Sequence, residues 1–260
     1  MVTCEVLLFV ATETELAQLE RAALERGACF EPIDVREHEM TLPRKIFRLG
    51  TIGADRVIAV KTGIGAIGDQ GSAALGLRCM QKTHATTVIC DGMAFGVSQA
   101  YQAYGDVLIS DSLFPYDDRE VVPTEDGGWK YAYGKSARVF GASPEALRLL
   151  NAYRPRVTGF RIHSGCMLSG NARIRSASFR DDLLRWSKNV AKTVVGGEME
   201  GFGLLSLARP KRPNWVVVEG ICDFAGDNQI DDADRHRQIA CSNAASFVLG
   251  ALADGKPTNG

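Results

Sequence analysis

The sequence predicts an α/β fold, because short apolar runs typical of buried strands alternate with longer segments of helical periodicity. Three of these runs stand at Glu5 to Val10, Thr86 to Cys90 and Asn214 to Val218. Segments with helical spacing cover Thr14 to Arg26 and, near the carboxyl end, Ile239 to Leu252. This alternation favours a sheet covered by helices, the arrangement of α/β proteins.

Length and composition are those of one ordinary globular domain. The chain has 260 residues, of which 45% are hydrophobic and 23% charged, and these values suit a single large domain. Because no internal repeat or linker divides the chain, we expect one domain over residues 1–253 and a flexible tail over residues 254–260.

Charge and cysteine usage limit the partners and the compartment. A net charge of -1 gives no reason to expect a nucleic acid or an anionic membrane. No apolar run approaches the roughly 18 residues of a membrane helix, and the N-terminus has no positive segment of a signal peptide. The seven cysteines are odd in number and scattered, as in reduced cytoplasmic proteins. Isolated histidines and the absence of a Cys-x-x-Cys pair predict no metal site.

The first strand and helix meet at a possible capping box. Thr12 and Glu15 have the required spacing, in which Glu15 bonds back to the backbone at the start of the helix. This structural role is sufficient to explain both residues from spacing alone.

A glycine-rich segment follows a predicted hairpin of strands Lys45 to Leu49 and Arg56 to Lys61. Gly63, Gly65 and Gly68 fit the Gly-x-Gly-x-x-Gly pattern of dinucleotide sites and open a predicted helix that reaches about residue 81. The pattern normally opens the first strand-helix unit of a domain. The preceding hairpin therefore disfavours a dinucleotide site.

The middle of the chain predicts strands at 105–115 and 157–162, with a helix at 143–153 between them. Ser143 and Pro144 are a typical helix start. Arg173 and Arg175 follow the second strand, and solvated surface is the expected place for both.

Glu198 and Glu200 flank Met199 where the apolar run that starts at Val194 becomes a helical segment ending near Leu205. Carboxylates at the end of a strand lie at the sheet edge where α/β proteins usually bind ligands. Two sugar hydroxyls would satisfy such carboxylates, although acids in a first helical turn are also favoured by the helix dipole.

The segment Gly196 to Gly201 resembles the Glu-Met-Glu motif of the nucleoside phosphorylase and nucleosidase superfamily, most closely its 5'-methylthioadenosine/S-adenosylhomocysteine nucleosidase branch. The other parts of the resemblance come in the family's order, from Glu15 through the loop at Gly92 and the Ser164-Gly165 pair to Asp223. The resemblance implies a single-domain, three-layer α/β/α sandwich with a central mixed sheet.

The resemblance also implies roles for individual residues. Glu200 would hold the ribose hydroxyls, Glu15 the attacking water, and Asp223 would protonate the purine at N7. The substrate-binding residues that it implies are Ala94, Phe95, Leu168, Ser169, Glu198 and Met199. It implies no cofactor or metal, and a homodimer with the helix from about residue 66 to 81 in its interface.

The implied reaction is hydrolysis of an adenine nucleoside to free adenine and ribose. Arginines that bind phosphate in phosphorolytic members are missing here, since Glu13 and Glu15 follow the first strand and residues 86–97 contain no Lys or Arg. Met93, Phe95 and Glu219 stand where members of the family usually have other residues. The resemblance therefore does not identify which adenine compound is the substrate. An adenine nucleotide such as AMP or ATP, a phosphorolytic reaction and a non-catalytic nucleoside-binding module are the alternatives.

Overall fold

The fold was analysed in a computed structural model of the chain. The structure describes residues 3–33, 45–133, 138–191, 193–205, 213–226 and 231–254. The predicted tail lies outside the described residues, except that Asp254 is the last residue of a helix.

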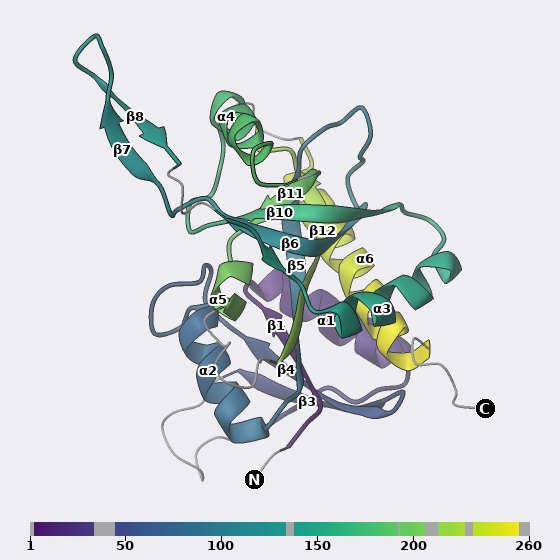
Figure 1. The fold of residues 1–260 in the computed structure, drawn as a ribbon. Coiled ribbons are helices and arrows are strands. Elements are labelled where there is room, and N and C mark those ends of the chain that lie inside the picture. The colour runs from purple at the N-terminus through teal and green to yellow at the C-terminus, as the bar shows by residue number, and fades with distance from the viewer. Residues whose placement is uncertain are drawn as a thin grey trace.

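One large mixed sheet forms the centre of the molecule (Figure 1). Its strand order is β11-β10-β6-β12-β5-β1-β4-β3-β2, with β9 paired to β6. The strands are β1 (Val6–Val10), β2 (Glu31–Pro32), β3 (Ile46–Ile52), β4 (Asp55–Lys61), β5 (Thr87–Gly96), β6 (Val107–Pro115), β9 (Phe140–Gly141), β10 (Ile162–Ser169), β11 (Val194–Glu198) and β12 (Asn214–Asp223). β1 is parallel to β4 and β5, whereas β12 is parallel to β5 and antiparallel to β6. The expected single-domain α/β fold with a mixed sheet is confirmed.

Helices lie on both faces of this sheet. α1, α3 and α6 pack together on one side, while α2 and α5 contact each other on the other (Figure 1). The helices are α1 (Glu13–Glu25), α2 (Ser72–Thr83), α3 (Pro144–Tyr153), α4 (Ala177–Ser187), α5 (Gly201–Leu205) and α6 (Ala233–Asp254), with a short 3-10 turn at Arg154–Arg156. Among the described residues, none of these helices has the length and apolar character needed to cross a bilayer.

The apolar runs of the sequence became the buried strands that hold the sheet together. All five residues of β1 are buried, as are Val216, Val217 and Val218 of β12. Removal of such side chains from water is the main favourable contribution to folding, at roughly 25 cal/mol per Å² of apolar surface.

Several boundaries differ from the sequence prediction. The terminal helix begins at Ala233 instead of Ile239, and the last core strand continues to Asp223. The helix expected from residue 66 begins only at Ser72, because Gly65 and Gly68 have positive φ angles (+89° and +99°) and shape turns instead. The predicted loop after Cys90 is a continuation of β5, so its glycines and bulky residues alternate along a strand. The strand expected from Val157 starts at Ile162.

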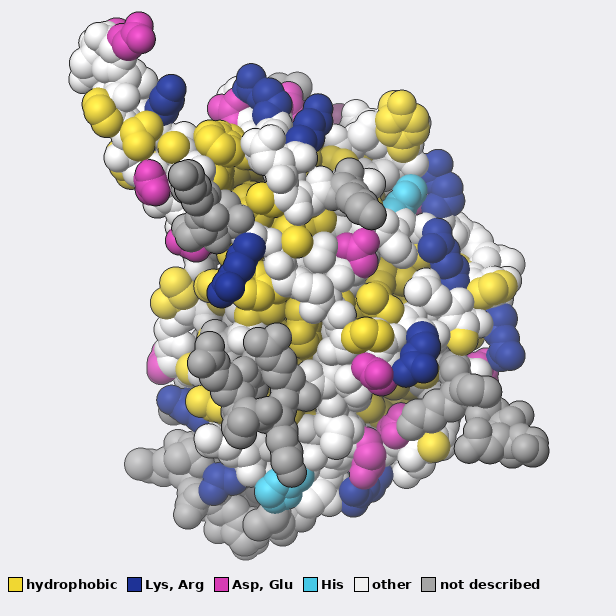
Figure 2. All heavy atoms as spheres, viewed as in Figure 1, with side chains coloured by type: hydrophobic (Ala, Val, Ile, Leu, Met, Phe, Trp, Pro, Cys, Tyr) yellow, Lys and Arg dark blue, Asp and Glu magenta, His cyan; other side chains and the backbone are white. Residues whose placement is uncertain are grey.

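A two-stranded hairpin projects from the body of the molecule. Its strands are β7 (Glu120–Pro123) and β8 (Trp129–Ala132), which form a separate sheet (Figure 1). Apolar side chains lie along it in the space-filling view (Figure 2), and Val121 and Trp129 are each 64% exposed. The hairpin takes no part in the pocket described next.

Candidate active site

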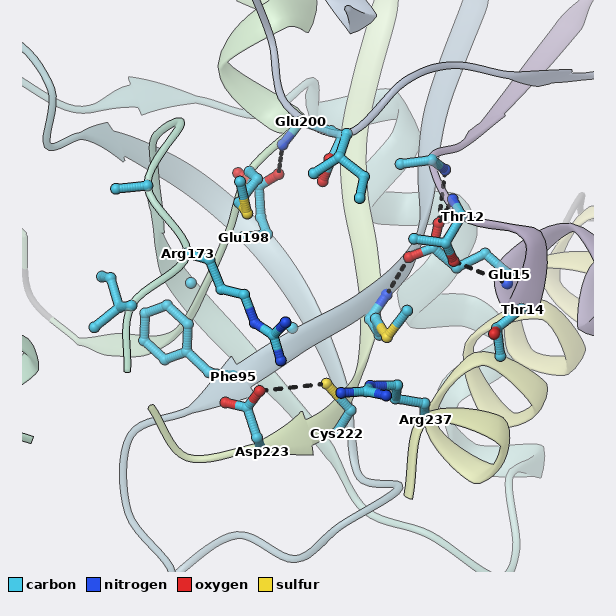
Figure 3. Close-up of a pocket in the computed structure, with 18 residues that line it drawn as sticks. Thr12, Thr14, Glu15, Phe95, Arg173, Glu198, Glu200, Cys222, Asp223 and Arg237 are labelled. Carbon is cyan, nitrogen blue, oxygen red and sulfur yellow. Dashed lines mark hydrogen bonds between the residues drawn. The ribbon is translucent and has the colours of Figure 1, made fainter. Parts of the chain in front are cut away.

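A pocket of about 350 Å³ opens where β1, β5, β11 and β12 end. The carboxyl ends of strands in an open α/β sheet are the usual ligand site. Of the residues that the sequence singled out, the pocket is lined by Glu15, Ala94, Phe95, Glu198, Met199, Glu200 and Asp223 (Figure 3). Segments that lie far apart in the chain thus converge on one cavity.

Glu15 has two functions in the structure at once. The capping box is present, because the Glu15 N–H donates to Thr12 Oγ1 and Glu15 Oε2 accepts the Thr12 N–H at 2.8 Å. The same carboxylate accepts the N–H of Ala11 at 2.6 Å and that of Met93 at 3.2 Å, and it lines the pocket. A carboxylate offers about four acceptor sites, so these three bonds fix its orientation and leave about one site for a ligand.

Two glycines bring the Glu-Met-Glu segment against the end of β5. β11 pairs with β5 through Gly196 opposite Gly96 and Gly197 opposite Phe95. A Cβ atom on Gly196 would lie 2.5 Å from the Phe95 carbonyl oxygen, a distance that no side chain tolerates. Close approach of the two strands therefore requires glycine here.

Glu200 is held by the glycine-rich loop that resembled a dinucleotide motif. The Gly65 N–H donates to Glu200 Oε1 at 2.6 Å, and Ser72 Oγ donates to the Glu200 carbonyl oxygen at 2.5 Å. Asn171 Oδ1 accepts the N–H of Ala66 at 3.0 Å. Since protein acceptors occupy these N–H groups, the loop positions Glu200 and does not offer a phosphate cradle.

Asp223 lies beside Phe95 because the two residues are partners in the register of β12 and β5. Asp223 Oδ1 accepts the Ala225 N–H at 2.9 Å, which is the turn-capping role that its position at a strand end allows. The side chain also lines the pocket next to Cys222 (Figure 3). A carboxyl and an aromatic ring thus stand together at one end of the cavity.

Leu168 and Ser169 are not brought into the pocket. Leu168 is fully buried in a core cluster with Phe114, and Ser169 Oγ accepts the Phe202 N–H at 2.8 Å. The pocket is lined instead by residues 172–174, just after the end of β10. The sequence contains a second Ser-Gly pair at Ser169-Gly170, directly before this stretch, and the resemblance was drawn on the pair at Ser164-Gly165 alone.

Two arginines that the sequence analysis did not assign to the site also line the pocket. Arg173 was expected at the solvated surface, and it is exposed, but its side chain also enters the pocket (Figure 3). Arg237 comes from the first turns of α6, and no motif marked it. Their contribution depends on tertiary folding, which spacing along the chain could not reveal.

Buried carboxylates crowd around the pocket. Burial raises the pKa of Glu15, Glu198 and Glu219, and it raises the pKa of Glu200 to about 8 with further repulsion from Glu15 and Glu198. Burial likewise raises the pKa of Asp91. Burial therefore shifts the titration of these acids to higher pH, because the charged carboxylate loses its contact with water.

Three of the acids have the spacing of oxygen ligands for a cation. One side-chain oxygen from each of Glu198, Glu200 and Glu219 lies within 4.8 Å of the others, as found among the described residues. A Ca²⁺ ion with oxygen ligands at about 2.3–2.6 Å could bridge such a set. Burial raises the pKa of all three groups, so a cation at these oxygens would have to displace protons at a higher pH than at exposed carboxylates.

Comparison with known proteins places this geometry in a family. The family model described as the Phosphorylase superfamily matches residues 5–253. A 5'-methylthioadenosine/S-adenosylhomocysteine nucleosidase of Listeria monocytogenes is 26% identical over 87% of this chain and 96% of that protein. A death domain-containing ATP nucleosidase of Amphimedon queenslandica is 25% identical over 95% of this chain, which spans about half (48%) of that protein.

Solved structures share the fold. The 5'-methylthioadenosine/S-adenosylhomocysteine nucleosidase of Neisseria meningitidis in complex with methylthio-immucillin-A superposes with a TM-score of 0.72 at 17% identity, covering 95% of this chain and 98% of that one. The futalosine hydrolase of Helicobacter pylori gives a TM-score of 0.71 at 18% identity and covers 95% and 96%. With a family model that matches almost its whole length, this chain belongs to the phosphorylase superfamily.

Proposed function

We propose that this protein is a purine nucleosidase, which hydrolyses the N-glycosidic bond of an adenine nucleoside and releases free adenine. One observation carries the proposal: Glu15, Glu200 and Asp223, from distant parts of the chain, line one pocket of about 350 Å³, a volume in the range of small-molecule sites. The family match and the nucleosidase names of the bacterial relatives support the same reaction.

The reaction needs three tasks from the protein. Cleavage of the bond builds positive charge on the sugar and negative charge on the departing base, while water attacks C1'. The base must be protonated, the cationic sugar stabilised and the water oriented. Three carboxylates in one cavity can divide these tasks among them.

At the sugar end, Glu200 holds the ribose hydroxyls. Gly65 fixes its Oε1, so its Oε2 is the atom assigned to the hydroxyls. Met199 lines the same side and packs on the sugar. The fixed carboxylate of Glu15, with about one acceptor site left, orients the water and takes its proton.

At the base end, Asp223 donates the proton or hydrogen bond to N7. Phe95 stands beside Asp223 and, with Ala94 and Ile174 of the same pocket lining, gives the purine an apolar surface. Aromatic and apolar contacts of this kind are typical of small-molecule sites that use a few polar groups for orientation.

Water is the proposed nucleophile, rather than phosphate. Phosphate carries about -1.5 to -2 charge and needs cationic donors near C1'. Glu15 faces the pocket, whereas Glu13 does not line it and pairs with Lys45 at 2.6 Å. The described cationic residues of the pocket, Arg173 and Arg237, point toward Asp223 and Cys222 (Figure 3).

The experiment that tests the proposal replaces the acid at the base end. Asp223→Asn is expected to lower kcat for adenine release by at least about 10²-fold, the lower end of general acid catalysis, because an amide supplies no proton. Release of adenine is followed by chromatography, and circular dichroism checks folding. The exposed Asp118→Asn is the matched control and is expected to retain full activity. Unchanged kcat in a folded Asp223→Asn protein would remove Asp223 from this role.

The names of the relatives leave the 5' group of the substrate open. The bacterial proteins are named for methylthioadenosine and adenosylhomocysteine, and the sponge protein for ATP. The choice between an uncharged and an anionic 5' group therefore has to be inferred from the side chains that line the pocket. A homodimer and a cytoplasmic location also remain proposals.

A further inference from the structure

Two guanidinium groups in the pocket have no task in the proposed reaction. Arg173 follows β10, and Arg237 belongs to α6. Figure 3 shows both guanidinium groups pointing toward Asp223 and Cys222, on the far side of the pocket from Glu198 and Glu200. The two guanidinium groups therefore lie together at one end of a cavity whose other charged lining residues are acidic.

These cations retain most of their donors for a ligand. Within the described part of the chain, Arg173 forms no hydrogen bond or ion pair, although a guanidinium carries five N–H donors. Arg237 donates through Nη1 to Asp234 Oδ1 at 2.8 Å, and the Asp234 side chain is 90% exposed. An exposed pair of this kind is weak, because water and salt screen the two charges, so a dianion in the pocket can compete for Arg237.

Further features favour an anion at this end. Thr14 lines the pocket from the first turn of α1 and adds a hydroxyl group. The N-terminus of that helix contributes partial positive charge. Glu15, Glu198 and Glu200 also line the pocket and repel an anion, whereas at the other end the two guanidinium groups stand against the single carboxylate of Asp223. An anionic group of the ligand is therefore favoured at the end where the guanidinium groups are.

The stereochemistry of a nucleoside identifies which part of the substrate reaches the arginines. In a β-nucleoside the base and the 5' carbon lie on one face of the ribose ring, and the 2' and 3' hydroxyls on the other. With Glu200 on the hydroxyls and Asp223 at N7, the 5' group extends on the side of Asp223. An inorganic phosphate that attacked C1' would approach from the opposite face, the side of Glu200.

We propose that Arg173 and Arg237 form a subsite for the 5'-phosphate of an adenine nucleotide. This inference rests on the nucleosidase function proposed above and names its substrate class. The Arg237 side chain is 34% exposed and Arg173 is also exposed, so further phosphates can extend into solvent. AMP, ADP and ATP are all expected to be substrates, whereas a methylthio group gains nothing from two guanidinium groups.

The test compares adenosine, methylthioadenosine, AMP and ATP as substrates of the full chain and of single variants. The wild-type protein is expected to show a kcat/KM at least about tenfold higher for AMP than for adenosine. Arg173→Gln and Arg237→Gln should each lower the AMP-to-adenosine ratio of kcat/KM by about 10- to 100-fold, the range for lost hydrogen bonds between charged groups. Arg175→Gln is the matched control, because Arg175 is exposed, close in sequence and outside the pocket.

Each outcome separates this inference from the function on which it rests. Adenine release without preference for AMP, and with ratios unchanged in both variants, would overturn the phosphate subsite and leave the nucleosidase intact. No adenine from any substrate would overturn both. A second arm incubates adenosine with millimolar inorganic phosphate. Phosphate-dependent ribose 1-phosphate, lost in the arginine variants, would assign the arginines to a co-substrate and contradict the 5' assignment.

Discussion

At the scale of single residues, the acids of the pocket make structural bonds that are compatible with the chemical tasks proposed for them. Glu15 caps α1 and still faces the pocket, and Asp223 accepts a turn N–H while lining the base end. The structural and functional interpretations of these residues are therefore compatible. Bonds to backbone N–H groups hold each carboxylate in one orientation, as a preorganised site requires.

Glu200 gives a prediction about pH at this scale. Its pKa is raised to about 8, first by burial and then by Glu15 and Glu198, and the ionised form is the one that stabilises a cationic sugar. We expect kcat/KM, which reports the free enzyme, to increase as pH rises through about 8.

Glu200→Gln keeps an acceptor for the Gly65 N–H but has no charge, so it should lose activity at every pH, as should Glu200→Ala. A flat profile from pH 6 to 9, or near-normal kcat/KM in either folded variant, contradicts this role.

At the scale of elements, the segment around α2 is the expected dimer interface. Ile64, Ile67 and Leu77 are 63%, 74% and 46% exposed, and such apolar groups on one segment often mark an interface. Ile64 also lines the pocket, so a partner there would lie close to the substrate.

A substitution tests that interface. Ile67→Glu places a charge in it, and light scattering at micromolar concentration should show a dimeric mass for the wild type and a monomeric mass for the variant. Leu24→Glu, at a 55% exposed position on α1, is the control and should stay dimeric. A monomeric wild-type protein would refute the dimer.

Elements also show what the sequence could predict and what it could not. The strands at Val6 and Asn214 and the helix after Thr12 follow from local periodicity and capping, which act within a few residues. The strand character of residues 91–96 was missed, because glycines and a buried Asp91 are atypical of strands. That stretch is stabilised by pairing with β12, a contact between residues more than one hundred positions apart.

The sequence predicted part of the candidate site, as it predicted part of the fold. The convergence of Glu15, Glu200 and Asp223 followed from the order of short motifs, each at the end of a strand. The resemblance implies Leu168 and Ser169 as binding residues, whereas residues 172–174 line the pocket in the structure. Arg237 enters through packing of α6 against the sheet, and no local pattern encodes that contact.

For the whole molecule, the buried acids predict an unusual pH dependence of stability. Asp91, Glu198, Glu200 and Glu219 have a pKa that burial raises in the folded protein. The unfolded chain releases these protons at lower pH than the folded chain does. Above about pH 4.5 the folded chain therefore binds more protons, and the free energy of unfolding falls as pH increases. The unliganded protein should therefore have a lower Tm at pH 8 than at pH 5.5.

Glu219 offers the control for this prediction. It is buried, one of its oxygens has no partner among the described residues, and it does not line the pocket. Glu219→Gln should reduce the fall of Tm between pH 5.5 and 8, because the amide side chain does not ionise in this range. A Tm that rises over this range in the wild type would show that the buried acids are ionised at little cost.

The central claim is that this pocket cleaves a nucleosidic bond with water. It is tested most directly by identifying the sugar product formed with and without millimolar phosphate, using the substrate that releases adenine fastest. The account predicts adenine together with free ribose, or ribose that keeps its 5' group, at a rate independent of phosphate. Ribose 1-phosphate, formed at a rate that follows the phosphate concentration, would contradict it.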